Sequence, residues 1–126
     1  PYAYKKSSAW NWPVKGRLVK KFLLYKHQKG IDIKGTIGSP VVATRAGVVV
    51  YSGNGLRGYG NLVILRHSNS YLSAYAFNRK ILVKEGQKIK AKQKIAEMGR
   101  RNGYNGLLHF EIRKKGQPVD PLKYLT

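Results

Sequence analysis

The sequence predicts an all-β fold, an antiparallel sheet of barrel-like or sandwich-like form with glycine-rich loops. Short segments rich in β-branched and aromatic residues recur from residue 30 onward, and turns that contain glycine separate them. No window of the chain holds a sustained helical period. At 126 residues the chain is long enough to bury the core of one domain, which we expect over residues 10–126.

Each predicted strand is bounded by residues that favour turns. The expected strands span residues 17–22, 31–33, 41–44, 48–53, 62–67, 71–77, 94–98 and 107–114. In the first of them, Leu18 and Phe22 should point toward the core. The last strand alternates clearly: its apolar face is Leu108, Phe110 and Ile112, and its second face carries Leu107, His109, Glu111 and Arg113. Three polar side chains therefore share one face of this strand.

The N-terminal residues are predicted to precede the folded domain. Residues 1–9 show no periodic pattern and are interpreted as the end of a linker. The chain begins without methionine or a signal peptide, so we expect it to be part of a longer protein. Trp10 and Trp12, just before Pro13, open the domain. They predict either an aromatic lid at the edge of the core or a platform on which sugars or bases stack.

The chain is strongly basic, with 25 Lys and Arg residues against 5 Asp and Glu residues, and it has no cysteine. This balance favours a polyanionic partner, such as nucleic acid, an anionic membrane or an anionic wall polymer, over a surface that is merely basic. No nucleic-acid recognition motif accompanies the charge, which disfavours the first of these partners. The lack of cysteine excludes disulfides and thiolate chemistry, and no apolar run is long enough to span a membrane.

Residues 84–95 combine closely spaced lysines with apolar residues. If this stretch is extended, Lys88, Lys90, Lys92 and Lys94 share one face and form a basic ridge that could follow an anionic polymer. The alternative is an edge strand on which lysine blocks pairing with another sheet. The pattern alone leaves both interpretations open.

Three histidines and five carboxylates limit the metal chemistry that the chain could support. Catalytic zinc takes three protein ligands and an open position for water. His27 and Asp32 lie close together in the sequence, and His109 lies on the last predicted strand. His67 ends an apolar strand, where we expect a hydrogen-bonded structural histidine.

A set of motifs, in order along the chain, resembles the LytM/lysostaphin-type zinc endopeptidases, which cut peptidoglycan cross-bridges. The resemblance covers about residues 12–125, and the matching stretches are residues 30–33, 38–41, 47–53, 58–61, 71–76, 83–87 and 108–113. The last of them, residues 108–113, contains His109-Phe110-Glu111, which matches the last three residues of the family's His-Leu-His-Phe-Glu motif. The resemblance implies the all-β fold of that family and a substrate cleft.

The residues that the family uses for catalysis are largely replaced. The resemblance places the three zinc ligands at Gln28, Asp32 and His109, and two assisting histidines at Phe77 and Leu107. Two good ligands do not hold zinc against water as three or four do, and the neutral amide of Gln28 is a poor third. Phe77 and Leu107 can neither transfer protons nor stabilise an oxyanion.

His27 misses the first ligand position by one residue. A bulge at Lys29 would let it reach the site but would leave the assisting histidines missing. We therefore expect no cofactor, no bound metal and no peptidase activity, with Asp32 and His109 as vestigial ligand positions.

Within the family, the chain most resembles degenerate, division-associated proteins that activate N-acetylmuramoyl-L-alanine amidases in the periplasm of Gram-negative bacteria. That resemblance implies a longer protein with an outer-membrane lipid anchor and a LysM glycan-binding module. It also implies two partners, peptidoglycan and an amidase whose regulatory helix binds in the former cleft. The expected groove residues are Gln28, Asp32, Arg57, Tyr59, Tyr75, Phe77, Leu107 and His109. The alternatives are a passive peptidoglycan-binding module and a residual zinc endopeptidase that cuts wall cross-links.

Overall fold

The computed structural model describes residues 10–101 and 103–126, which form a ten-stranded sheet whose strand pairs are antiparallel. Its strands are β1 (Arg17–Lys20), β2 (Ile31–Lys34), β3 (Pro40–Val42), β4 (Gly47–Gly53), β5 (Asn61–Arg66), β6 (Tyr71–Ile81), β7 (Lys88–Ile89), β8 (Lys94–Arg101), β9 (Tyr104–Lys114) and β10 (Gln117–Val119). Two short 3-10 helices, η1 (Leu24–Lys26) and η2 (Pro121–Lys123), complete the elements. The predicted all-β fold is confirmed. The expected linker, residues 1–9, lies outside the described residues.

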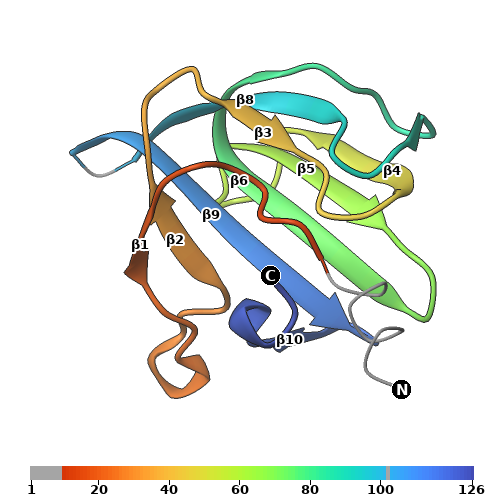
Figure 1. Ribbon diagram of the computed structural model, residues 1–126, viewed down its shortest axis with the longest axis horizontal. Coiled ribbons are helices and arrows are strands. Elements are labelled where there is room, and N and C mark those ends of the chain that lie inside the picture. The colour runs from red at the N-terminus through yellow and green to blue at the C-terminus, as the bar shows by residue number, and fades with distance from the viewer. Residues whose placement is uncertain (1–9, 102) are drawn as a thin grey trace.

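The long strands β6 and β9 organise the sheet, and they run side by side through its middle (Figure 1). The strand order is β1-β2-β9-β8-β6-β5-β4-β7, with β10 paired to β9 and β3 paired to β8. Strand β6 pairs with β9 over residues 71–76 and then with β8 over residues 78–81. This exchange of partners bends the sheet around the core, as expected for a barrel-like sheet.

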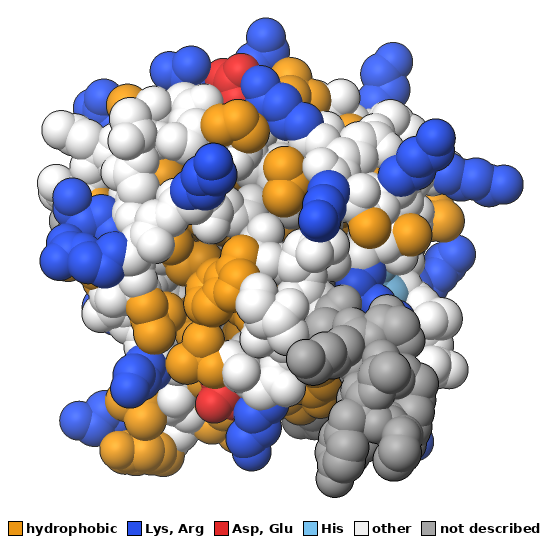
Figure 2. Space-filling model, in the orientation of Figure 1, with side chains coloured by type: hydrophobic (Ala, Val, Ile, Leu, Met, Phe, Trp, Pro, Cys, Tyr) orange, Lys and Arg blue, Asp and Glu red, His pale blue; other side chains and the backbone are white. Residues whose placement is uncertain are grey.

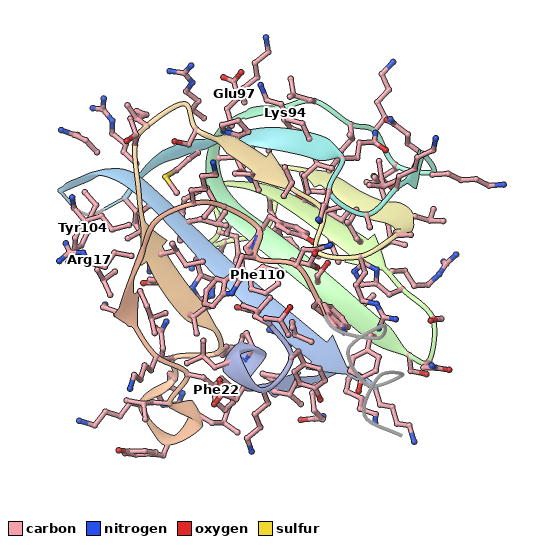
Figure 3. All side chains as sticks on the ribbon, viewed as in Figure 1. Arg17, Phe22, Lys94, Glu97, Tyr104 and Phe110 are labelled. Carbon is pink, nitrogen blue, oxygen red and sulfur yellow. The ribbon has the colours of Figure 1, made fainter. Side chains whose placement is uncertain are left out.

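The main core lies on one side of β9. Its apolar face carries the fully buried Leu108, Phe110 and Ile112, and Phe110 points into the interior (Figure 3). The segment of residues 10–14, drawn in red, passes in front of the sheet and adds Trp10 and Val14 to the same core (Figure 1). Among the described residues, no helix is long and apolar enough to cross a membrane.

The first strand is shorter than expected. β1 ends at Lys20, and its pairing with β2 shifts register between Leu18 and Lys20. Leu18 packs against the core, but Phe22 is only half-buried and lies beyond the strand. Beyond Lys20 the chain leaves the sheet and forms η1. An isolated antiparallel bridge pairs Leu23 with Gln28, the residues on either side of this turn.

Lys88, Lys90, Lys92 and Lys94 do not share one face of a continuous strand, as both interpretations assumed, because a turn divides residues 88–94 between two strands. β7 contains only two residues, and β8 begins at Lys94. In the turn, Lys92 has a left-handed φ of 68°, and its N–H donates to the carbonyl of Ala43 at 2.8 Å. The Gln93 side chain closes the turn by accepting from the backbone N–H of Lys90 at 2.9 Å. Lys88 and Lys94 therefore lie on different strands.

Candidate functional site

The functional face of β9 is the one that turns away from the core. Antiparallel pairing places Asp32 of β2 directly opposite His109, and Ala76 of β6 lies opposite His109 on the other side. Directly opposed residues point to the same face of a sheet. The pairing therefore gathers Asp32, His109 and Glu111 at one place, although they come from strands far apart in sequence.

His109 is held between two carboxylates. Its Nδ1 lies 2.6 Å from Oδ1 of Asp32, and its Nε2 lies 2.8 Å from Oε2 of Glu111. Ionised carboxylates only accept hydrogen bonds, so both ring nitrogens must donate and the ring is an imidazolium. Burial disfavours this charge, but the hydrogen bonds to Asp32 and Glu111 more than offset it and raise the pKa of His109. Burial likewise opposes ionisation of the two carboxylates, but the contacts with His109 lower the pKa of each.

Two arginines and a tyrosine also contact the two buried carboxylates and stabilise their negative charge. Arg113 donates from Nε and Nη2 to Oε1 of Glu111, at 3.0 and 2.8 Å. The Tyr59 hydroxyl donates to Oε2 of the same carboxylate at 2.9 Å. Arg101 approaches Asp32, with Nη1 at 3.9 Å from Oδ2. Both buried carboxylates are thus neutralised by protein cations, as buried charges need to be. We call these six side chains the ion network: Asp32, Tyr59, Arg101, His109, Glu111 and Arg113.

The ligand positions implied by the family resemblance come together, but their arrangement does not fit zinc. Gln28 donates from Nε2 to Oδ1 of Asp32 at 3.4 Å, so its amide turns its donor end toward the site. Both nitrogens of His109 are engaged by carboxylates, which leaves no lone pair for a metal. Within residues 10–101 and 103–126, no three His, Cys, Asp or Glu side chains are placed to hold a metal ion. The space of the metal is filled by a proton and hydrogen bonds.

Two adjoining cavities open on this face, and we call them together the groove. The polar one has a volume of about 300 Å³ and is lined by residues that include His27, Gln28, Phe77, Arg101 and His109. The apolar one has a volume of about 350 Å³ and is lined by residues that include Leu56, Leu62, Ile64, Leu72 and Arg113. Tyr59 and Glu111 line both cavities, so the two meet at the ion network.

The expected groove residues occupy three kinds of position. Gln28, Tyr59, Phe77 and His109 line the polar cavity. Arg57 is exposed on the β4–β5 loop, between residues that line the two cavities. Asp32 and Leu107, also expected in the groove, are each 2% exposed and line neither cavity, so they offer little surface to a partner.

Tyr75 corrects the expectation, because it lies in the core and not on a groove wall. It is fully buried, with its ring 5.3 Å from that of Phe110, and its hydroxyl bonds the Thr44 backbone N–H at 3.0 Å and Ser73 Oγ at 2.8 Å. In a regular strand Phe77 would share this inward face. Phe77 instead has a left-handed φ of 67°, which turns its ring into the groove, 6.2 Å from that of His109.

Several functional residues were missed by the sequence reasoning. Glu111 and Arg113 share the His109 face of β9, and that alternation is the signal that could have placed them in the site. Arg101 carries no such signal: its position over the Phe77 ring, 4.3 Å from the centroid, depends on the fold. The apolar cavity depends on Leu56, which only the path of a glycine-rich loop brings over β5 and β6.

The fold and the comparisons with known proteins together define the class of protein. Residues 26–121 match the model of Peptidase family M23, and the chain belongs to that family. It is 54% identical over 117 residues to the lipoprotein NlpD/LppB homolog of Pseudomonas aeruginosa, covering 92% of this chain and 39% of that protein. It is 52% identical over 119 residues to the murein hydrolase activator NlpD of Escherichia coli, covering 94% of this chain and 31% of that protein.

Solved structures of the same fold include a zinc-containing peptidase from Vibrio cholerae. It has a TM-score of 0.77 and 33% identity, over 90% of this chain and 39% of that chain. The chain thus spans about a third of the length of the curated relatives it matches.

Proposed function

We propose that this domain is a non-catalytic activator of an N-acetylmuramoyl-L-alanine amidase, acting in peptidoglycan splitting during cell division. The observation that carries the proposal is the ion network, in which His109 holds a proton between two carboxylates where a peptidase would hold its metal. Because carboxylates engage both ring nitrogens of His109, that ring is free neither to bind a metal nor to act as a base toward water. The groove beside it is nevertheless retained. The names of the relatives, murein hydrolase activator among them, support this reading.

The groove suits an amphipathic helix from the amidase. Its apolar cavity would take leucine-like side chains spaced i, i+4 on the helix, because Leu62, Ile64 and Leu72 form its wall and the exposed Leu56 its rim. Its polar cavity carries the basic side chains of Lys29 and Arg101, which favour an acidic residue one or two turns further along the helix.

Activation by this route is a shift between two states of the amidase. The domain must bind the amidase with its regulatory helix released more tightly than the amidase with that helix in place. A shift from 1% to 99% active enzyme requires a difference of about 5.5 kcal/mol between the two affinities. A largely preformed groove helps, because little of the binding energy is then lost in ordering the groove.

The same proposal places the protein in the cell envelope. The P. aeruginosa relative is named a lipoprotein, and we propose a periplasmic domain whose longer protein is anchored to the outer membrane of a Gram-negative bacterium. Peptidoglycan and the amidase would then both be within reach.

The test is release of dye-labelled peptidoglycan by a matched amidase in the presence of the domain. We expect stimulation by the wild-type domain and loss of most of it in Leu56→Glu, which puts a charge into the apolar cavity. Leu24→Glu is the matched control, because Leu24 is a similarly exposed leucine on η1 that lines neither cavity. Arg57→Glu probes the rim.

Three outcomes would overturn the proposal. Absence of stimulation is one, and equal stimulation by wild type, Leu56→Glu and Arg57→Glu is another. The third is dye release by the domain alone that a chelator abolishes, since this would show a zinc endopeptidase. Co-sedimentation with peptidoglycan and no effect on any amidase would instead indicate a passive wall-binding module.

A further inference from the structure

A third cavity, of about 540 Å³, shares no lining residue with the groove. It is lined by Val14, which packs with Leu108 in the core, whereas the groove lies on the His109 face of β9. Trp12, Pro40 and Val42 add apolar surface to it. Figure 2 shows hydrophobic side chains gathered in the middle of this face, with lysine and arginine side chains around them. We call it the Trp12 cavity.

The backbone holds the aromatic side of the Trp12 cavity in place. Asn11 donates from its backbone N–H to the carbonyl of Thr44 at 3.0 Å, and Val42 donates to the carbonyl of Pro13 at 2.8 Å. Trp12 lies between these two anchored residues and remains 38% exposed, whereas Trp10 is 2% exposed in the core. A large aromatic ring on a fixed backbone, open to solvent on one side, is a surface on which a flat apolar ring face can stack.

The rim of the Trp12 cavity is basic. Lys15 and Lys92 are exposed and line it, and none of its nine described lining residues is acidic. The turn that removed Lys92 from the expected ridge is what brings it here, through its hydrogen bond to Ala43. An apolar floor with a few charged groups at the edge, and a volume in the range of about 300–1,000 Å³, is typical of a small-ligand site.

Most of the chain's few carboxylates are engaged elsewhere and do not offset this charge. Asp32 and Glu111 are buried in the ion network, Glu97 pairs with Arg79 and Lys94, and Asp120 caps η2. A ligand that suits the Trp12 cavity therefore combines apolar ring faces with negative charge. A sugar polymer that carries carboxylates has both of these properties.

We propose that the Trp12 cavity binds peptidoglycan glycan strands from which the stem peptides have been removed. The inference rests on the proposed function, because an amidase of that class makes such strands. It hydrolyses the amide between the lactyl carbonyl of N-acetylmuramic acid and the amine of L-alanine: the C–N bond breaks, and water supplies hydroxyl to the carbonyl and hydrogen to the nitrogen. The products are a free carboxylate on the sugar and an ammonium on the peptide.

The free lactyl carboxylate distinguishes the product from the intact wall at this site. In the denuded strand it is an anion close to the sugar ring, where Lys15 and Lys92 can meet it while the ring stacks on Trp12. In the intact wall the same group is a neutral amide that carries a bulky peptide. An activator with this site would stay where its amidase has already acted.

The experiment measures binding of the purified domain to a denuded GlcNAc–MurNAc tetrasaccharide, by isothermal titration calorimetry at low salt. We expect weaker binding of tetra-N-acetylchitotetraose, which has the sugars without the carboxylates, and of the tetrasaccharide with its stem peptides. Trp12→Ala should lower the affinity for the denuded tetrasaccharide about tenfold. Lys15→Gln and Lys92→Gln should each lower it about two- to fivefold and reduce its dependence on salt.

Matched controls separate the cavity from general charge and general exposure. Lys80→Gln removes one exposed positive charge outside the cavity. Tyr25→Ala removes an aromatic residue of η1 that is 77% exposed and does not line the cavity. Both should leave the affinity within about twofold of wild type. Trp12→Phe should keep part of the binding that Trp12→Ala loses, and far-ultraviolet circular dichroism should show that all variants are folded.

The proposal is overturned if denuded and peptide-bearing glycans bind equally, or if Lys80→Gln weakens binding as much as Lys92→Gln. It is also overturned if sedimentation velocity shows a concentration-dependent dimer that Trp12→Ala dissociates and no glycan binding, since a second copy would then occupy the cavity. No amidase is present in this assay. A failure of glycan binding is therefore distinct from a failure of amidase activation.

Discussion

Glu111→Gln is a direct test of the ion network, because the amide keeps the shape of the carboxylate and removes its charge. Glu111 is 2% exposed and accepts hydrogen bonds from His109, Tyr59 and Arg113. Breaking a buried ion pair by removing one partner costs about 3–5 kcal/mol. The side chain of Arg113 is 28% exposed and keeps part of its hydration. We therefore expect a loss at the lower end, about 3 kcal/mol in the free energy of unfolding.

The pH dependence of this loss has a definite sign. The folded pKa of His109 is raised above the ordinary value of 6.5, so its contribution is complete below pH 6.5 and is lost as pH rises through the folded pKa. The pKa values of Asp32 and Glu111 are lowered from 3.8 and 4.5, so their contributions are complete above those values and are lost as pH falls through the folded ones. The effect of Glu111→Gln should thus be largest between these ordinary values of 4.5 and 6.5.

Urea denaturation at a series of pH values measures the loss, and NMR titration of the His109 ring measures its pKa, which should fall in the variant. The control is Glu97→Gln, which removes a carboxylate from the exposed pair with Arg79 and should change stability little. Lys94 and Glu97 lie at the edge of the molecule (Figure 3). If Glu111→Gln is as stable as wild type and the His109 titration is unchanged, His109 is not held as an imidazolium between two carboxylates.

Three further substitutions test other parts of the molecule. Gln28→His adds a third nitrogen or oxygen donor beside Asp32 and His109, which should let zinc displace a ring proton of His109. Metal analysis after zinc dialysis should then rise toward about one zinc per chain, and Asp32→Asn in that background should abolish it. Tyr75→Phe removes the hydroxyl that Thr44 and Ser73 bond in the core, and chemical denaturation should show a loss of about 1–3 kcal/mol. Gly30→Ala would place a Cβ 2.1 Å from the carbonyl oxygen of Phe110. A melting curve should therefore show a destabilisation of about 1–3 kcal/mol or more. An unchanged melting temperature would mean that β2 and β9 are not so closely packed.

Much of the fold was predictable because strand periodicity and turn residues act locally. The seven strands expected from residue 31 to residue 114 all correspond to observed strands, with ends displaced by a few residues. The alternation of β9 correctly separated the core residue Phe110 from the groove residue His109. The family resemblance placed Gln28 beside Asp32, and the two side chains are 3.4 Å apart. Both interpretations of segment 88–94 assumed an extended chain, whereas the structure has a turn there, because alternating lysine and apolar residues do not distinguish the two conformations.

The site itself depended on which strands become neighbours. Nothing in the sequence states that β9 pairs with β2, and only this pairing puts Asp32 within 2.6 Å of His109. Tyr75 and Phe77 are two residues apart in β6, so a regular strand would point both side chains to the same face. They point in opposite directions because Phe77 has a left-handed φ, which the alternation of residues in the sequence does not predict.

By itself, the sequence determined the all-β class and the excess of positive charge. These properties depend on residue type and spacing, which tertiary contacts do not alter. Only the tertiary structure decided that the pKa of His109 is raised, because the shift depends on Asp32 from β2 and Glu111 from β9 meeting at its ring. It also decided that Lys92 lines the same cavity as Trp12.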